Sequence, residues 1–278
     1  MNAVAIVSLP PFSVLLSVYH RENPAFLDQA LHSIWEAQTL QPDQIVLVED
    51  GPLPAALRAV VQQWQQRLGQ QLTTVPLTTN QGLSAALNAG LTQCRHELVA
   101  RMDTDDLSEP ERFAWQVEFM AAHPHIGVCS GQIAEWDETM QRQLSQRSLP
   151  TDHAHIHAFA QRRSPINHPC VMFRKSVVLK AGGYPRVYPE DYALWGKLLH
   201  TGVQFANLPQ TLLKMRVGNA LAQRRGLAFL RGEITVFRMF AAIGFISRKQ
   251  LYINIVSRTV LRLSPLWLKQ FFYRRFRS

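Results

Sequence analysis

The residues best suited to chemistry are Asp103-Thr104-Asp105-Asp106, which place three carboxylates within four positions. Carboxylates this close repel one another unless protons or a cation offset their charge. Their oxygens are ligands that Mg²⁺ and Mn²⁺ prefer, and such ions commonly share their coordination with a substrate's phosphates. The cluster therefore suits a metal-bound diphosphate. It is equally consistent with a solvated cap for the helix that begins near Pro110.

This cluster follows the last of four β-rich segments that alternate with helical patterns. We expect strands at 13–18, 44–49, 72–77 and 97–102, with helices between them at 24–38, 54–68 and 83–94. That order predicts a mainly parallel sheet flanked by helices, whose ligands bind at the carboxyl ends of the strands. The polar residues that follow the four strands are Tyr19 and His20, Asp50, Asn80 and the acidic cluster.

The second half of the chain has a less regular pattern. We expect helices at 110–122, 152–161 and 191–201, strands at 126–134 and 168–173, and amphipathic helices at 221–242 and 247–263. No expected segment is long and apolar enough to span a membrane, since even 227–246 contains Arg231, Glu233 and Arg238. Three scattered cysteines favour a reducing compartment over a disulfide framework or a zinc site.

The net charge of +9 comes from the end of the chain. Residues 216–278 contain 13 Lys and Arg residues against Glu233 alone, whereas residues 1–215 contain 16 against 19 acidic residues. The aromatic residues that alternate with arginines near the C-terminus are Phe271, Phe272, Tyr273 and Phe276. This pattern is typical of helices lying on an anionic membrane surface. It is also consistent with two helices packed on the rest of the protein, with a solvated basic face.

Five sequence blocks occur in a fixed order, and they resemble family 2 glycosyltransferases of the GT-A fold from about Ser13 to Arg216. They are SVLLSVYH, VEDG, NQGLSAALNAG, VARMDTDDLSEPERF and PEDYALWGKL. The continuation RVGN, RRG and a basic helical tail is similar to the bacterial branch that builds exopolysaccharides of the amylovoran type. The resemblance implies a Rossmann-like α/β domain with a basic amphipathic C-terminal extension.

The resemblance further implies a nucleotide-sugar site. Tyr19 would pack against the base, and Asp50 would accept a hydrogen bond from that base, usually uracil. A tyrosine at a strand end and a turn-forming Asp-Gly are the simpler alternatives. The other positions that match the nucleotide-sugar contacts of the family are Asn80, Gly82, Asn88, Asp103 and Arg216.

By the same resemblance, Asp103 and Asp105 would bind Mn²⁺ or Mg²⁺, with Asp103 also near the ribose. Asp106 would orient these two neighbours without binding the metal ion itself. Gly218 stands where relatives have a histidine, so a further metal ligand from that loop is not expected.

Asp191 matches the general base of the family, and Glu190 precedes it. A base is required because transfer removes a proton from the acceptor hydroxyl. The alternative for Asp191 is a charge that favours a helix N-terminus. His168 would border the acceptor pocket. The equal alternative is a histidine near the core whose hydrogen bonds are satisfied within the protein.

Together these features predict a metal-dependent inverting glycosyltransferase that moves sugar from a UDP-sugar to a growing, lipid-linked polysaccharide unit. We expect a catalytic domain at 1–217, with a nucleotide-sugar half at 10–107 and an acceptor half at 108–217. Residues 218–278 would attach the cytoplasmic protein to the inner face of the bacterial membrane.

Two other classes of protein share some of these features. A nucleotidyltransferase would carry a glycine-rich basic loop after its first strand, where this chain reads SVYHRENP. A nucleic-acid-binding protein would use the basic tail, but the tail's aromatics fall in amphipathic helices and the rest of the chain is acidic. We therefore expect no nucleic-acid partner.

Overall fold

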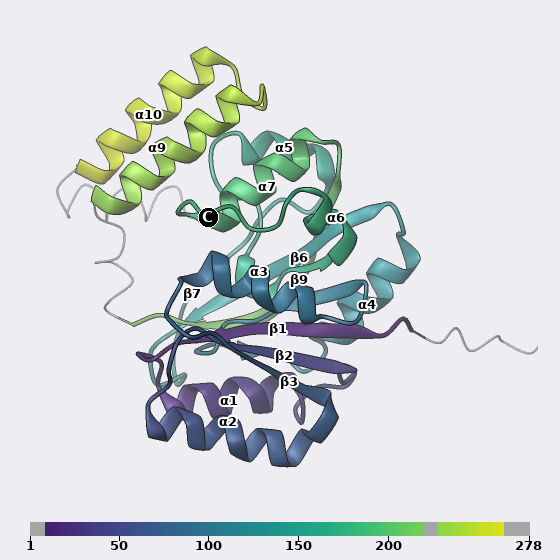
Figure 1. The fold of residues 1–278 in the computed structure, drawn as a ribbon. Helices are drawn as coiled ribbons and strands as arrows, with labels where there is room; N and C mark the ends of the chain where they lie inside the picture. The colour runs from purple at the N-terminus through teal and green to yellow at the C-terminus, as the bar shows by residue number, and fades with distance from the viewer. Residues whose placement is uncertain (1–8, 219–226, 264–278) are drawn as a thin grey trace, which may run out of the picture.

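The computed structural model of the protein describes residues 9–218 and 227–263. Nine strands of these residues form one sheet in the order β3-β2-β1-β4-β8-β6-β9-β5, with β7 paired to β6 (Figure 1). Its first half is parallel and consists of β1 (Phe12–Val18), β2 (Gln44–Glu49), β3 (Leu72–Pro76) and β4 (Leu98–Arg101). β1 and β2 are buried along nearly their whole length, as apolar strands covered on both faces are. The four expected strands are confirmed to within one residue at each end.

Helices cover both faces of the sheet and form two hydrophobic cores with it (Figure 1). One core includes Val14 and Leu16 of β1, and the other includes Leu15, because successive side chains of a strand point to opposite faces. The first core contains residues of α1 (Pro24–Ile34), α2 (Ala55–Leu68) and α4 (Arg112–Ala122). The second contains residues of α3 (Leu83–Gln93), α5 (His153–Ala160), α6 (Lys175–Lys180) and α7 (Glu190–His200).

Among the described residues, the largest differences from the expected element boundaries lie at the end of α1 and at 168–173. α1 ends at Ile34 rather than at residue 38, because Trp35 leaves helical geometry and the Gln38 amide donates to the Ser33 carbonyl at 2.7 Å. The expected strand at 168–173 is a 3₁₀ turn at His168–Cys170 followed by β8 (Met172–Arg174). A second 3₁₀ turn, Gly69–Gln71, joins α2 to β3.

The second half of the sheet is mixed. β8 lies antiparallel to both β4 and β6 (Ile126–Trp136), and β6 lies parallel to β9 (Gln204–Arg216). The edges are completed by β7 (Gln143–Arg147), antiparallel to β6, and by β5 (Leu107–Ser108), antiparallel to β9. The short β5 begins one residue after the acidic cluster, so this half of the sheet holds the end of the acidic loop.

The 13-residue strand β9 is absent from the sequence-based expectation. It contains Pro209, which cannot donate a ladder hydrogen bond and argues against a central strand. The structure accommodates Pro209 at an irregularity, since the register with β6 passes from Asn207 to Thr211 across Gly131. Tertiary pairing with β6 thus makes a strand of a segment whose local pattern does not predict one.

α9 (Leu227–Ala242) and α10 (Arg248–Leu263) form an antiparallel pair beside α7 (Figure 1). α9 places Phe237 and Phe240 in the same core as α7, and a Cβ on Gly196 would lie 2.1 Å from the Phe240 ring. This close approach requires glycine in α7. α9 therefore packs closely on α7, and the domain boundary expected after residue 217 stays a prediction.

α10 is fastened to α9 through the buried carboxylate of Glu233. Glu233 forms ion pairs with Arg258 at 3.4 Å and with Arg262 at 3.2 Å. The expected pair of amphipathic helices is thus present and packed on the protein, while the aromatic segment from Phe271 to Phe276 lies outside the described residues. Among residues 9–218 and 227–263, no helix combines the length and the apolar character needed to cross a membrane.

Candidate active site

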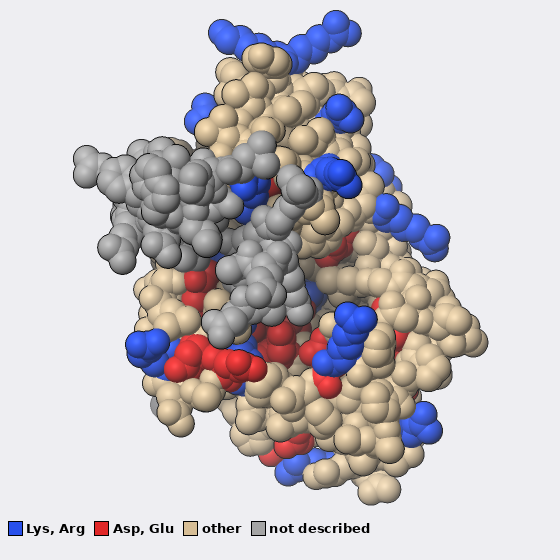
Figure 2. Space-filling model, turned by 90° about the vertical axis from the view of Figure 1, so that its left-hand side faces the viewer, with Lys and Arg blue, Asp and Glu red and all other residues tan. Residues whose placement is uncertain are grey.

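The carboxyl ends of the parallel strands meet at one edge of the sheet. The Asp50 amide donates to Val18 at the end of β1 at 2.8 Å, and the Met102 amide donates to Leu15 at 3.1 Å. The loops after β1, β2 and β4 are therefore neighbours, as the parallel topology predicts. Acidic side chains gather across the middle of one face of the molecule (Figure 2).

Asp103, Asp105 and Asp106 form a compact carboxylate cluster after β4. One ligand atom of each lies within 4.8 Å of those of the other two. Burial, and then the charges of Asp105 and Asp103, raise the pKa of Asp106 well above its usual range. A cation at this position would relieve that repulsion, and three carboxylates provide the hard oxygen ligands that Mg²⁺ and Mn²⁺ require. The residues therefore fit a divalent metal ion.

Arg216, at the end of β9, fixes the shape of the acidic loop. Its backbone amide donates to the Asp106 carboxylate at 2.7 Å, and its Nε donates to the Asp105 carbonyl at 2.8 Å. The guanidinium also donates to Gln29 at 2.9 Å and lies 3.8 Å from the centre of the Phe26 ring. The expected contact of Arg216 with the diphosphate stays a prediction; its hydrogen bonds here join β9 and α1 to the acidic loop.

Arg101 is a residue of this site that the sequence-based reasoning missed. It is the last residue of β4, is 2% exposed, and makes two hydrogen bonds to the Asp103 carboxylate. One of them, from Nη1 to Oδ2, measures 2.6 Å. The available signal was an arginine at the end of an apolar strand two residues before Asp103, but burial of that arginine is visible only in the fold.

Asp50 holds the turn that was expected to contact the nucleotide. Its two carboxylate oxygens accept hydrogen bonds from the backbone amides of Gln81 at 2.7 Å and Gly82 at 3.0 Å. The Asn80 amide returns a hydrogen bond to the Asp50 carbonyl at 3.1 Å. A Cβ on Gly51 would lie 2.6 Å from the Asn80 nitrogen, so glycine is needed there. The structure brings Asp50, Asn80 and Gly82 together; their contacts with a base stay a prediction.

Tyr19 lies half-buried directly after β1, with its ring against His20 at 5.5 Å between centroids. Asn88 on α3 uses its whole amide on the backbone of Tyr184, accepting from its nitrogen at 2.7 Å and donating to its oxygen at 2.8 Å. Asn88 therefore ties α3 to the loop that leads to α7. The contact of Asn88 with the nucleotide-sugar stays a prediction.

The carboxylates of Glu190 and Asp191 occupy the first turn of α7. Burial, and then the neighbouring Asp191, raise the pKa of Glu190 to about 7. Burial also raises the pKa of Asp191, while the positive charge of Arg101 acts to lower it. The negative charge of Asp103 also acts to raise the pKa of both carboxyls. The α7 carboxylates therefore lie within electrostatic reach of the acidic cluster.

His168 is buried beneath the same loop. It is 8% exposed, its Nε2 forms a hydrogen bond with the Tyr184 hydroxyl at 3.1 Å, and its ring lies 5.9 Å from the Trp195 ring. Burial, and then the charge of Arg101, hold the pKa of His168 well below its usual range, so the imidazole is neutral. These contacts match the alternative of a satisfied histidine near the core.

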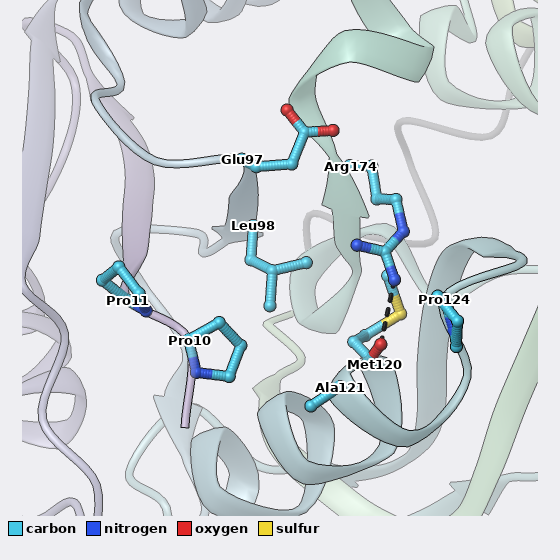
Figure 3. A pocket seen from close by; sticks show the side chains of 8 residues that line it. All are labelled: Pro10, Pro11, Glu97, Leu98, Met120, Ala121, Pro124 and Arg174. Atoms are coloured by element: carbon cyan, nitrogen blue, oxygen red, sulfur yellow. Dashed lines mark hydrogen bonds between the residues drawn. The ribbon is translucent and has the colours of Figure 1, made fainter. Parts of the chain in front are cut away.

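A cleft of about 410 Å³ lies at the opposite ends of the strands (Figure 3). Its lining residues are Pro10, Pro11, Glu97, Leu98, Met120, Ala121, Pro124 and Arg174. The Arg174 guanidinium donates to the carbonyls of Met120 at 2.9 Å and Ile126 at 3.0 Å. None of the site residues expected from the sequence is among the residues that line this cleft.

Comparison with known proteins defines the class of enzyme. Residues 13–182 match the family model described as glycosyl transferase family 2. The chain belongs to this family and is a glycosyltransferase.

Among individual proteins, the chain is similar to the amylovoran biosynthesis glycosyltransferase AmsE of Erwinia amylovora. The two are 44% identical over 96% of this chain and 99% of that protein. The chain is also 35% identical, over 96% of each protein, to the UDP-Gal:alpha-D-GlcNAc-diphosphoundecaprenol beta-1,3-galactosyltransferase of Escherichia coli. The expected likeness to exopolysaccharide enzymes of the amylovoran type is thereby confirmed.

Solved structures confirm the expected GT-A fold. S. aureus TarS superposes with a TM-score of 0.68 at 17% identity over 96% of this chain, which spans 46% of the TarS chain. The mannosyltransferase PcManGT from Pyrobaculum calidifontis, solved in complex with GDP-Man and Mn2+, gives a TM-score of 0.62 at 15% identity over 96% of this chain and 80% of its own.

The raised pKa of Glu190 predicts a pH-dependent stability. The folded carboxyl keeps its proton above the ordinary pKa of 4.5, up to about 7. The contribution of the protonated Glu190 carboxyl to the free energy of unfolding is therefore complete below about pH 4.5. It is lost as the pH rises through about 7. Glu190→Gln removes this titration, so the melting temperature of the variant relative to wild type should rise from about pH 5 to about pH 8. Thermal unfolding at a series of pH values measures the difference.

Glu118→Gln is the matched control, because Glu118 is an exposed carboxylate on α4. Its melting temperature relative to wild type should stay nearly constant over the same pH range. A constant difference for Glu190→Gln as well would contradict the burial of an ionisable carboxyl at the start of α7.

Proposed function

We propose that this glycosyltransferase moves a sugar from a UDP-sugar, with the help of Mn²⁺ or Mg²⁺ and with inversion, to a polyprenyl-diphosphate-linked polysaccharide unit. The observation that carries the proposal is the carboxylate cluster at the carboxyl edge of the sheet, with its ligand atoms within 4.8 Å of one another. The α7 carboxylates, within electrostatic reach of this cluster, supply the second part of the site.

Asp103 and Asp105 would hold the metal ion, and Asp106 would support them from its buried position. When bound, the ion would offset the negative charge of the departing nucleoside diphosphate. The choice of Mn²⁺ is supported by the solved complex of PcManGT with GDP-Man and Mn2+, a protein of the same fold. The cluster's own chemistry supports a hard divalent cation and does not distinguish Mn²⁺ from Mg²⁺.

The donor would lie along the carboxyl edge beside Tyr19 and the turn held by Asp50. Uridine is supported by the UDP-Gal in the name of the Escherichia coli relative and by complexes of TarS with UDP-GlcNAc and UDP. The residues we assign to the donor are Tyr19, Asp50, Asn80, Gly82, Asn88, Asp103 and Arg216. Of these, Asn88 would act from a distance, because its amide is engaged by Tyr184.

Asp191 would be the general base. In the proposed step, the acceptor hydroxyl oxygen forms a bond to the anomeric carbon while the bond from that carbon to the diphosphate oxygen breaks. Asp191 takes the hydroxyl proton, and its raised pKa brings the carboxylate closer to the basicity that this proton transfer needs. Attack from the face opposite the leaving diphosphate inverts the anomeric carbon. Glu190 and His168 would border the acceptor.

Two substitutions separate the proposed roles. Asp191→Asn should lower kcat by roughly 10²–10⁴-fold, the usual contribution of a general base, with little change in UDP affinity. Asp105→Ala should instead weaken Mn²⁺-dependent binding of UDP, because it removes a metal ligand. Calorimetric titration of UDP with and without Mn²⁺, together with a transfer assay, measures both effects.

Glu118→Ala, on the exposed side of α4, is the control and should change neither quantity. If wild type binds no nucleoside diphosphate, or if Asp105→Ala binds UDP as wild type does, the proposed function is wrong. Parallel titrations with GDP and TDP test the choice of uridine separately from the choice of metal.

We also propose that the enzyme is attached peripherally to the inner face of the membrane, through residues 218–278. Within the described part, the outer face of α10 carries exposed apolar side chains at helical spacing. Their exposed fractions are 72% for Tyr252, 47% for Ile253, 43% for Val256 and 60% for Val260. Such a stripe is unusual on a soluble helix and is typical of one that lies on lipid.

Charge and position support this surface. Arg248 and Lys249 are exposed at the start of α10, and Lys and Arg side chains surround the upper part of the molecule (Figure 2), where Figure 1 shows α9 and α10. On its other side the helix pair contacts the loop before α7: Phe229 packs on Tyr188 at 5.4 Å, and a Cβ on Gly232 would lie 2.0 Å from the Tyr188 oxygen. A lipid-bound α10 would thus hold the acceptor side of the site near the membrane.

The membrane hypothesis is tested by flotation with vesicles that contain phosphatidylglycerol. Val256→Glu combined with Val260→Glu should lower the fraction of protein bound to vesicles by roughly ten-fold or more. The change replaces two apolar side chains that would contact lipid by negative charges that anionic lipid repels. Deleting the chain after Gly218 would be a poor test, because α9 supplies Phe237 and Phe240 to the core.

Thr92→Glu combined with Gln93→Glu, at exposed positions at the end of α3, adds the same two charges away from α10; it is the control and should retain most of the binding. Unchanged flotation of the Val256→Glu, Val260→Glu double variant would contradict a lipid contact at the outer face of α10. A change in sedimentation without any change in flotation would instead indicate an interface between protein molecules.

A further inference from the structure

Arg101 is held more rigidly than a surface arginine could be. Its backbone amide donates to Val171 at 2.8 Å, and its carbonyl accepts from the Arg112 guanidinium at 2.6 Å. Arg112 is itself 0% exposed and donates to Gln116 at 3.1 Å. Hydrogen bonds at both its amide and its carbonyl therefore fix the backbone of Arg101.

The Arg101 side chain is directed at a single carboxylate. Nη1 and Nη2 each donate to a different oxygen of Asp103, the two-pronged geometry that only a planar guanidinium provides. Within the described residues, Nε has no hydrogen-bond partner. An unsatisfied buried donor is unfavourable. Arg101 therefore makes both hydrogen bonds to Asp103 while its third kind of donor, Nε, is left without a partner.

The positive charge of Arg101 also acts on the second group of carboxylates in the site. It acts on Glu190 and Asp191 at the start of α7 as well as on Asp103. Asp106, by contrast, is satisfied by the backbone amide of Arg216. Each end of the acidic cluster is therefore held by a different arginine, one through its side chain and one through its backbone.

Stability alone is a weak explanation for this ion pair, because the Arg101 side chain loses its water while Asp103 stays 35% exposed, and this desolvation offsets much of the attraction. We propose that Arg101 is a positioning residue: it fixes the orientation of the Asp103 carboxylate so that this ligand is ready for the divalent cation and the donor. This inference rests on the proposed function. Arg101 itself, buried behind Asp103, would touch neither the metal nor the substrate.

The test is Arg101→Lys, which keeps the positive charge and removes the two-pronged contact. We expect its affinity for Mn²⁺ in the presence of UDP to fall about 10–100-fold, as when partners of metal ligands are lost. Mn²⁺ affinity is measured by electron paramagnetic resonance of the free ion, with folding checked by thermal unfolding. Arg174→Lys, an arginine that donates to backbone carbonyls at the opposite end of the strands, should change Mn²⁺ affinity by less than about two-fold.

Asp103→Asn provides a second route that leaves Arg101 in place. If Arg101 acts through Asp103, then Arg101→Lys should weaken Mn²⁺ binding little further in the Asp103→Asn background, because coupled residues are not additive. In metal-free buffer, Asp103→Asn should lower the melting temperature more than Asp105→Asn, since it leaves Arg101 buried without its carboxylate.

Mn²⁺ affinity of Arg101→Lys within about two-fold of wild type, or fully additive losses in the double variant, would overturn the inference and leave Arg101 a structural residue. Failure of wild type to bind Mn²⁺ with UDP would instead reject the proposed function, and this inference with it. The two failures are therefore distinguishable from the wild-type titration alone.

Discussion

The repulsion among three carboxylates after β4 is the constraint on which the site depends. Asp103, Asp105 and Asp106 are held together in spite of their charge, and burial together with this repulsion raises the pKa of Asp106 well above its usual range. The protein offsets part of this repulsion with Arg101 and with the backbone amide of Arg216. In the proposed function, a divalent cation would offset the remainder.

The two arginines connect that loop to different parts of the fold. Arg216 belongs to β9, so the mixed half of the sheet and α1 determine where Asp105 and Asp106 lie. Arg101 belongs to β4, and its charge also acts on the carboxylates of α7, a helix whose Gly196 packs closely against Phe240 of α9. The basic C-terminal helices thereby support the helix that carries Glu190 and Asp191, as well as presenting a surface of their own.

Much of the fold follows from local sequence patterns, but the parts that pack at long range do not. Apolar runs predict β1, β2 and β4 because those strands are buried on both faces. β9 escapes prediction because Pro209 interrupts its pattern, and only pairing with β6 reveals the strand. The carboxylates can be found from their spacing. Arg101 cannot, because a buried arginine and an exposed one look alike in sequence, and the partner of Asn88 lies 96 residues away.

The central claim is that the carboxylates after β4 bind a divalent metal ion together with a nucleoside diphosphate. It is tested most directly by anomalous X-ray diffraction from crystals grown with MnCl₂ and UDP. The account predicts one Mn²⁺ peak at the carboxylates of Asp103 and Asp105, bridged to the diphosphate, with the base near Tyr19 and Asp50. UDP bound without a metal peak at these carboxylates, or bound in the cleft beside Pro10 and Arg174, would contradict it.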